Sequence, residues 1–466
     1  MTSTWAAAEV GTAQLGDARR TARLMTLVET LAAHPTASIA DACGSWAGTK
    51  GAYRFLSSPA IVPAAITAAH RSATLDRMQA QEHALVLAIQ DTTELNFTSH
   101  PALAGRGRLS RPGQYGLLVH SVLAVSATGV PLGLLHQQNW TRDPATIGQA
   151  TTRRQRPISE KESQRWLDGQ EATLAALPPD VDVLTIADAE ADIYDLLAAP
   201  RRAGADLLLR ATHNRRLVTE PEDELAYLWT TLDAAPCAGR YTITLGPTPT
   251  RREREATLQI RFQTVTMAPP HHHRHRAQCQ PLTVGAILVT EEDPPAGVEA
   301  VSWRLLTTLP VSSLAAALAL VEAYTLRWRI ERYHFVLKSG CRLEALQLDT
   351  VERLERALAV YAVVAWRLLW LTYLAREEPE GDGEGVLTPG EAVVLRAWME
   401  QHRHTWPEQP TTREVVRAIA CLGGFLGRRG DGEPGVTVLW RGLRTLELLV
   451  AGYHLAQAQR SPGPPP

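Results

Sequence analysis

Two short apolar runs, each leading into an aspartate, set the strongest limit on how this chain folds. Residues 84–90 read ALVLAIQ and precede Asp91, and residues 183–187 read VLTIA and precede Asp188. Short, predominantly apolar runs of this length are typical of buried strands. We therefore expect an α/β fold whose central strands end at these two carboxylates.

A second stretch, residues 323–340, carries a phenol, a guanidinium, a carboxylate and an ammonium at helical spacing. At roughly 100° per residue, steps of three, four and seven keep such side chains within an arc of roughly 60° on one helix. A carboxylate flanked by cations suits a metal ion beside phosphate groups, whereas a solvated amphipathic helix is the plainer alternative. The four residues are Tyr324, Arg327, Glu331 and Lys338.

Lysine usage favours the functional interpretation of this stretch. The chain contains three lysines, Lys50, Lys161 and Lys338, and uses arginine for its other basic side chains. A lysine kept against this bias indicates a position that needs a compact point charge. We therefore predict a functional role for Lys338.

Asp91, Asp188 and Glu331 match the ligand set of a two-metal site. If the helix that carries Glu331 packs across the sheet, the carboxylates converge on hard divalent cations, which favours Mg²⁺ or Mn²⁺ over zinc. The alternative for a strand-end aspartate is a turn or cap residue, and Glu190 and Asp192 lie near Asp188 and are rivals for its role. Position at the strand end favours Asp188.

Composition indicates a soluble intracellular protein without a disulfide framework. The 466 residues carry a formal net charge of −2, and the five cysteines include no CxxC pair. The sequence does not open on an apolar signal core, so we expect a reduced cytoplasm and no membrane partner. Because the net charge is slightly negative, a polyanion would have to bind to local clusters of arginine, such as those at 19–23, 201–216 and 251–254. Each of these clusters alone is also typical of a solvated surface.

The composition of the sequence and the spacing of its apolar residues change along the chain, which predicts several domains. Residues before about 70 read as helical, and a basic run within them suggests a DNA-reading module or an ordinary helical cap. Alternating segments at about 213–300 indicate antiparallel strands, and a Gly-rich linker lies at 377–385. We expect a helical domain at 1–70, an α/β domain at 71–376 with a β-rich insertion at about 213–300, a helical domain at 386–458 and a disordered tail at 459–466.

Individual elements follow from the same patterns. A helix is expected at 18–33, and the helix with the Tyr324 motif is expected to begin after Ser312 or Ser313 and to be followed by a buried helix at 351–375. Strands are expected at 116–127 and 130–136, joined at Thr128-Gly129, and at 206–212, 240–245, 256–265, 282–289 and 302–308.

The tract His271–His275 has two interpretations. Its spacing is too tight to place three imidazoles well around one metal ion, so we expect a solvated loop, with opportunistic metal binding as the alternative.

Several strings together resemble the DDE transposases of insertion-sequence family four. They are DTTELNF at 91–97, DAEADIYDLL at 188–197 and the spacing Y-x2-R-x3-E-x6-K at 324–338, with GTAQLGDARRTAR near the N-terminus and GGFLGRRGDGEPGV near the C-terminus. The resemblance implies an RNase H-like catalytic core with a β-rich insertion. It also implies an N-terminal helical DNA-binding domain and a C-terminal helical dimerisation domain.

The resemblance assigns a role to each candidate residue. It implies that Asp91, Asp188 and Glu331 are the catalytic residues and hold two Mg²⁺ ions, with Mn²⁺ as a substitute. DNA phosphates would contact Tyr324, Arg327 and Lys338, with Arg210 a further contact. Trp303 would stack on a flipped base and Trp328 would brace the distorted end, although a lone tryptophan is more often a core residue.

The implied reaction is cut-and-paste DNA transposition through a hairpin at the transposon end. The implied partners are double-stranded DNA with inverted-repeat ends, target DNA and a second copy of the chain in a synaptic complex, in a bacterial cytoplasm and on the nucleoid when DNA is bound. Two rival functions are a DNA-binding inhibitor that has lost catalysis and a metal-dependent nuclease that does not join strands. All three carboxylates are present, which speaks against the inhibitor.

Overall fold

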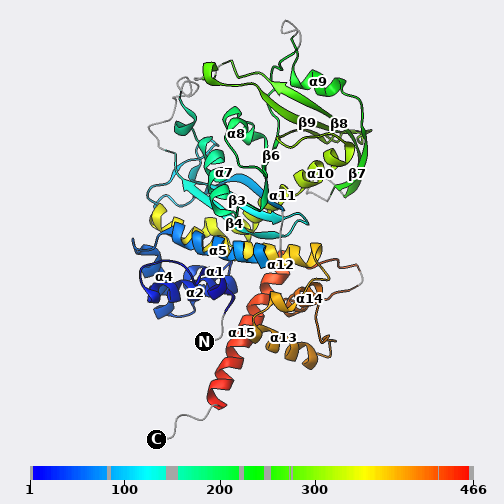
Figure 1. Cartoon of the computed structure of the whole chain (residues 1–466). Helices are drawn as coiled ribbons and strands as arrows, with labels where there is room; N and C mark the ends of the chain where they lie inside the picture. Colours follow the sequence, from blue (N-terminus) through cyan, green and yellow to red (C-terminus); the bar gives the residue numbers. More distant parts are fainter. Residues whose placement is uncertain are drawn as a thin grey trace. The chain divides into compact units, whose positions relative to one another are not determined.

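The chain folds into two compact units, each assembled from separate stretches of sequence. The computed structural model describes residues 4–80, 85–142, 156–219, 225–245, 253–271, 273, 276–428 and 430–460. We call Met1–His83, Thr92–Pro144 and Arg329–Pro466 the helical unit, and Ala84–Asp91 and Ala145–Trp328 the sheet unit. Figure 1 labels the elements of both.

The strands of the sheet unit change from parallel to antiparallel pairing across the sheet. The start of β1 pairs in parallel with β5, from Leu85↔Asp182 to Gln90↔Ala187, and β5 pairs in parallel with β6. The remaining strands are antiparallel. The order is β1-β5-β6-β10-β9-β8-β7, with bounds Leu85–Asn96, Asp182–Ala187, Ala205–Arg210, Ser302–Thr307, Leu282–Glu291, Arg254–Met267 and Gly239–Leu245.

These strands confirm the expectations from apolar runs and alternation. In β5, residues 183–187 are all buried, as expected for a parallel strand that is covered on both faces. In β7, half-buried and exposed residues alternate, which is typical of the edge of a sheet. The antiparallel strands β7, β8 and β9 lie in the region whose sequence alternates between apolar and polar residues.

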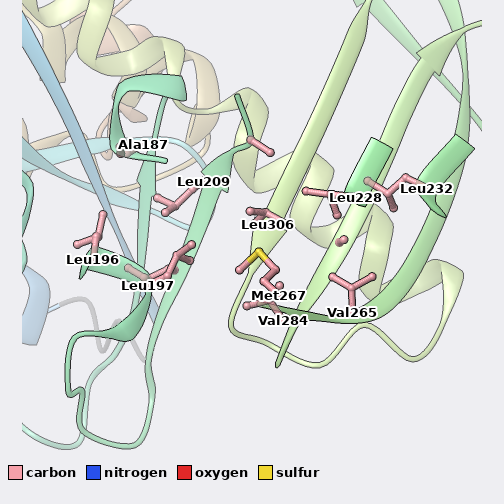
Figure 2. Close-up of a cluster of buried hydrophobic side chains, with 14 of the residues drawn as sticks. Ala187, Leu196, Leu197, Leu209, Leu228, Leu232, Val265, Met267, Val284 and Leu306 are labelled. Carbon is pink, nitrogen blue, oxygen red and sulfur yellow. The ribbon is translucent and has the colours of Figure 1, made fainter. Parts of the chain in front are cut away.

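One hydrophobic core holds the sheet unit together. Helices α7 (Gln164–Ala176), α8 (Tyr194–Ala198) and α9 (Leu228–Ala234) supply it with Trp166, Leu196 and Leu228, which are fully buried. Figure 2 shows side chains from α8 and α9 together with those of the strands, among them Ala187 of β5. Because Ala187 is part of the core, the backbone that presents the next residue, Asp188, is firmly held.

The helical unit contains the expected hairpin. Strands β3 (Tyr115–Ser126) and β4 (Pro131–Trp140) pair antiparallel, and β2 (Gly107–Arg108) pairs with the start of β3. Gly129 in the connecting turn has a φ of 101°, a conformation that glycine adopts without strain.

Helices from both ends of the chain complete the helical unit. Asp17 caps α2 and Ser38 caps α3, so the expected helix at 18–33 is confirmed. In α4, Phe55 is buried, whereas Trp46 is 75% exposed. The bounds are α1 Trp5–Val10, α2 Ala18–Ala33, α3 Ile39–Cys43, α4 Trp46–Ser57, α5 Pro63–Ala80, α12 Val351–Glu377, α13 Pro389–Gln401, α14 Thr412–Leu422 and α15 Val436–Arg460.

Helix α12 is the centre of the helical unit. It packs against α2, α4 and α5, against β4, and against α14 and α15. Its length and apolar composition would suit a membrane span, but its most apolar window is wholly buried within the protein, so α12 is a core helix. The indole N–H of Trp366 donates to the backbone oxygen of Pro131 at 2.9 Å, which ties α12 to β4.

Strand β1 belongs to both units, and through it the strand orders give the fold class. In the helical unit β3 is the neighbour of β1 and of β4; in the sheet unit β5 and then β6 follow β1. The order β4-β3-β1-β5-β6, with antiparallel strands first and parallel strands last, together with helices at both ends of the sequence, is that of an RNase H-like α/β core.

Two predictions touch residues outside the described part of the chain. Of the expected tail at 459–466, residues 461–466 lie outside it, whereas α15 extends to Arg460. Arg251 and Arg252 of one arginine cluster also lie outside it.

Candidate active site

Asp91 and Asp188 occupy equivalent positions on neighbouring parallel strands. Gln90 and Ala187 are paired in register; Asp91 follows Gln90 within β1, and Asp188 follows Ala187, the last residue of β5. Neighbouring strands lie about 4.8 Å apart, so the two carboxylates leave the sheet side by side. The sheet unit therefore brings together two of the three predicted catalytic carboxylates.

The prediction that both aspartates end their strands is wrong for Asp91. Strand β1 continues through Asp91 to Asn96, whereas β5 ends at Ala187 and Asp188 caps the short 3₁₀ helix Ala189–Ala191. The carboxylate of Asp188 accepts a hydrogen bond from the backbone N–H of Glu190 at 2.9 Å. Thr92 and Thr93, which favour strand geometry, extend β1 beyond its apolar run.

The surroundings of Asp188 favour a bound cation. Burial raises the pKa of this carboxyl above its usual value, and the nearby charge of Asp91 raises it further, while Arg327 acts in the opposite direction. Two oxygen-donor carboxylates whose charges repel each other are the kind of pair that a hard divalent cation stabilises. The donor set thus fits the ions implied by the sequence.

The two sequence rivals of Asp188 are engaged by protein partners. Glu190 forms an ion pair with Arg165 at 2.6 Å. Asp192 is buried and forms an ion pair with Arg215, also at 2.6 Å. Both carboxylates therefore have structural partners, which favours Asp188 as the ligand.

Aromatic and cationic side chains surround Asp188 within the sheet unit. The rings of Trp303 and Tyr324 meet edge to face with centroids 5.6 Å apart. Burial raises the pKa of the Tyr324 phenol, and the charges of Arg327 and Arg210 lower it. Tyr324 and Arg327 are buried, whereas Arg210 is exposed and Trp303 is half-buried. The Arg210 guanidinium and the Trp303 indole are therefore the groups of this cluster that suit a nucleic-acid backbone and an unstacked base.

Strand pairing explains the positions of Arg210 and Trp303. Leu305 of β10 pairs with Arg210 of β6, so Trp303, two residues away, lies on the same face of the sheet as Arg210. Trp328 is 53% exposed, and the Arg327 guanidinium lies over its ring at 4.9 Å from the centroid.

The prediction of a single continuous helix through the motif is wrong, because the structure breaks this helix at residues 326–327. It begins at its cap Ser313 as α10 (Leu314–Thr325), turns, continues as α11 (Trp328–Phe335) and ends in a π-helical segment, Val336–Gly340. The turn closes with a backbone hydrogen bond from Arg327 to Tyr324, three residues back. A tight turn and a wide π turn both change the rotation per residue, so the 100° spacing fails.

The motif is accordingly divided between the two units. Tyr324 and Arg327 belong to the sheet unit, whereas Glu331 and Lys338 belong to the helical unit. Within the helical unit the Lys338 ammonium donates to the backbone oxygen of Glu94 at 2.7 Å and lies 3.7 Å from the Glu344 carboxylate. In the described ranges there is no preformed group of three or more His, Cys, Asp or Glu side chains arranged to hold a metal ion.

Arg165 is a site residue that the sequence reasoning missed. Burial lowers the pKa of its guanidinium, and the charges of Glu190, Glu162 and Asp188 raise it. No pattern in the sequence singled it out.

The histidine tract is only partly described. Its residues 272, 274 and 275 lie outside the described residues. His273 does not face solvent freely, because its Nε2 lies 3.0 Å from Asp195 and its Nδ1 lies 3.1 Å from the Cys279 sulfur. His271 is exposed, as expected for a solvated loop, whereas His273 is half-buried in the same loop.

Three protein-family models match successive parts of the chain. The model described as transposase DNA-binding matches residues 2–61, and the model described as transposase DDE domain matches residues 159–367. The model described as transposase Tn5 dimerisation domain matches residues 363–463. Their order is the predicted one, with DNA binding first, the catalytic domain in the centre and dimerisation last, and the chain therefore belongs to the Tn5-like DDE transposases.

Proposed function

We propose that this transposase excises its element from DNA and joins it to a new site by a cut-and-paste reaction. Water first hydrolyses one strand at the transposon end and leaves a 3′ hydroxyl. That hydroxyl attacks the opposite strand, which closes a hairpin; water reopens the hairpin, and the 3′ ends then join target DNA.

Three carboxylates carry the chemistry in this proposal. Asp91, Asp188 and Glu331 hold two Mg²⁺ ions per active site, for which Mn²⁺ substitutes. Bound divalent cations supply Lewis acidity that activates the attacking hydroxyl and stabilises the leaving oxygen. The pKa of Asp188, which is raised first by burial and then by the charge of Asp91, supports this assignment.

The basic and aromatic residues position the DNA in this proposal. Arg327, Arg210, Tyr324 and Lys338 contact phosphates beside the scissile bond, and Trp328 braces the distorted end. Trp303 stacks on a base that leaves the duplex, because a tight hairpin cannot keep its terminal base pair stacked. The edge-to-face contact with the buried ring of Tyr324, which holds the Trp303 indole in place, supports this role.

The domains divide the remaining work. We assign recognition of inverted-repeat ends to residues 1–70, catalysis and target DNA to residues 71–376 with the β-rich insertion, and pairing of two protomers in a synaptic complex to residues 386–458. The matches to DNA-binding and dimerisation models support the first and last assignments. We place the protein in the bacterial cytoplasm and on the nucleoid when it is bound to DNA.

The observation that carries the proposal is the pair of carboxylates on β1 and β5, with Arg327 beside them, in a chain matched by a DDE transposase model. Phosphodiester displacement needs cation-binding carboxylates and phosphate-binding cations at one place. The sheet unit alone supplies two such carboxylates, Asp91 and Asp188, and two such cations, Arg210 and Arg327.

Replacement of the third carboxylate tests the proposal. We expect Glu331→Ala to abolish strand cleavage on DNA that carries the element's ends, because one ion ligand is lost, while the affinity for that DNA changes less than about threefold. Cleavage is read on denaturing gels with Mg²⁺, and affinity is read by gel shift in a chelator. An equal loss of binding would show that Glu331 is a structural residue.

The same assay separates the rival functions. Nicking by the wild-type chain excludes an inhibitor without catalysis. Hairpin and joined products exclude a simple nuclease, whereas nicks without either product would favour it.

A further inference from the structure

A cavity of about 810 Å³ opens in the sheet unit at a place that the proposed catalytic residues do not line. Its walls are the turn around Ile158 and Lys161, the segment 192–195 after the 3₁₀ helix, the loop 213–216, and residues 268–271 and 273. Cavities that bind small ligands have volumes of about 300–1,000 Å³. The cavity is therefore large enough for a nucleotide.

Positive charge predominates in the lining. Four arginine or lysine residues line the cavity against two aspartates, and both aspartates have partners. Asp192 is paired with Arg215 at 2.6 Å, and Asp195 with His273 at 3.0 Å. Lys161 and Arg216 have no ion-pair partner among the residues that the structure describes.

Asp192 builds the wall that presents Arg216. Its buried carboxylate accepts hydrogen bonds from the backbone N–H groups of Thr212 and His213, at 2.7 and 2.9 Å, and from Arg215 at 2.6 Å. This clamp fixes the start of the loop that follows β6. The cation of Arg216 is thus carried by a pre-organised loop, which lowers the entropic cost of binding an anion.

Lysine usage points to the same cavity. Lys161 is one of three lysines in the chain, and Lys338 is another. An ammonium is a compact donor that suits a single phosphate, whereas a planar guanidinium suits a fork of two acceptors. Lys161 and Arg216 together offer both modes.

The apolar part of the lining suits a base. Ile193, Tyr194, Pro269 and Pro270 line the cavity. The Tyr194 hydroxyl donates to the backbone oxygen of Gln280 at 2.6 Å, which fixes the ring. Base stacking on such aromatic faces is tolerant of sequence.

Short stretches of chain join the cavity to the carboxylate pair. Asp188 and Asp192 lie at the two ends of the same 3₁₀ helix. Arg165 lies four residues after Lys161 in the sequence. Burial lowers the pKa of its guanidinium, and the charge of Asp188 is among those that raise it. A DNA strand that passes Asp188 thus has a basic pocket beside its path.

We propose that this cavity binds an unpaired nucleotide of a DNA strand, with Lys161 and Arg216 on its phosphate and the base against Tyr194 and the prolines. The inference rests on the proposed function, because it adds a subsite for DNA that runs past the carboxylate pair. The chemistry is a phosphodiester-linked nucleotide, and its source is donor DNA that flanks the element or target DNA.

The first test uses a short single-stranded oligonucleotide of arbitrary sequence and the full-length chain in a chelator, so that no cleavage takes place. We expect the double variant Lys161→Gln with Arg216→Gln to bind about tenfold more weakly. Each single variant lowers the salt slope of log Kobs by about 0.7, the value for one phosphate contact on a single strand. Arg240→Gln, on the edge strand β7 and away from this lining, is the control and keeps wild-type affinity.

The outcome is decided by comparison with the control. If the double variant binds the oligonucleotide as tightly as the wild type and Arg240→Gln, the proposal is overturned. An equal loss in all variants would also overturn it, because the cations would then act as an unspecific surface. Retained thermal unfolding midpoints, together with a charge reversal at Lys161 that weakens binding further, exclude misfolding as the cause.

The source of the nucleotide follows from two further DNAs. A loss confined to element ends with an unpaired overhang beyond the cut supports flanking donor DNA. A loss confined to capture of a second duplex by pre-cut ends supports target DNA. These are binding measurements, so failure of Glu331-dependent cleavage would overturn the proposed function without deciding the oligonucleotide test.

Discussion

Trp303 separates two steps of the proposed reaction at the level of a single side chain. Stacking of a base on an aromatic ring contributes about 1–3 kcal/mol, which corresponds to about 5- to 150-fold in rate or binding. We expect Trp303→Ala to slow hairpin formation by about this factor and to leave the first nick almost unchanged. Both steps are followed on denaturing gels; Trp303→Phe keeps a flat ring and retains most hairpin formation, and uniform loss of both steps would contradict stacking.

Asp188 offers a test of the carboxylate pair without a DNA substrate. Neutralising one of two adjacent half-buried carboxylates relieves repulsion, so Asp188→Asn raises the unfolding midpoint in a chelator. With Mg²⁺ or Mn²⁺ the wild type has the higher unfolding midpoint. An ion at 100 times its Kd stabilises the wild type by about 2.7 kcal/mol, and it stabilises the variant by less. Calorimetry in both conditions measures this, and a variant that responds to the ions like the wild type would remove Asp188 from the ligand set.

Glu9 is a buried carboxylate that links stability to pH. His70 at 2.8 Å and Arg77 at 2.6 Å outweigh its burial and lower its pKa from 4.5 to about 2. Because the folded pKa is depressed, the stabilisation is full above pH 4.5 and is lost as the pH falls from 4.5 toward 2. Glu9→Gln should therefore lower the unfolding free energy by about 3 kcal/mol at pH 7. Chemical unfolding at several pH values would contradict this if the difference did not shrink in acid.

At the scale of elements, two glycines of α15 differ in what surrounds them. A Cβ at Gly442 would lie 1.8 Å from the backbone oxygen of Ile419, so α14 and α15 approach closely there, whereas a Cβ at Gly452 meets nothing within 4 Å. We expect Gly442→Ala to destabilise the chain by at least about 2 kcal/mol, since the helices must separate. Gly452→Ala, the control, stabilises it by up to about 1 kcal/mol. Thermal unfolding measures both, and equal effects would contradict the close contact.

Elements also show what the sequence predicts and what it does not. Apolar runs and alternation correctly predicted β5, β7, β8 and β9. The spacing of apolar residues along a strand shows whether one or both of its faces are buried. The break between α10 and α11 was not predictable from local signals, since residues 324–330 contain neither glycine nor proline. The pairing of Asp91 with Asp188 depends on strand order, which periodicity does not encode; the family resemblance supplied it.

At the scale of the molecule, the sequence predicted the order of functions better than the division of the chain. The family models confirm DNA binding, catalysis and dimerisation in that order. The compact units, however, follow contacts and not sequence order, so the helical unit combines the first and last stretches of the chain. Changes in composition and periodicity along the sequence do not reveal such long-range contacts, because these depend on which apolar faces pack against each other.

The central position of α12 has a consequence for biosynthesis. Helices α2, α4 and α5 pack on α12, whose last residue is Glu377, so the N-terminal helices leave the ribosome long before their packing partner exists. At about 5–20 residues per second this delay lasts tens of seconds. The nascent N-terminal helices reach their mature packing only when translation is nearly finished.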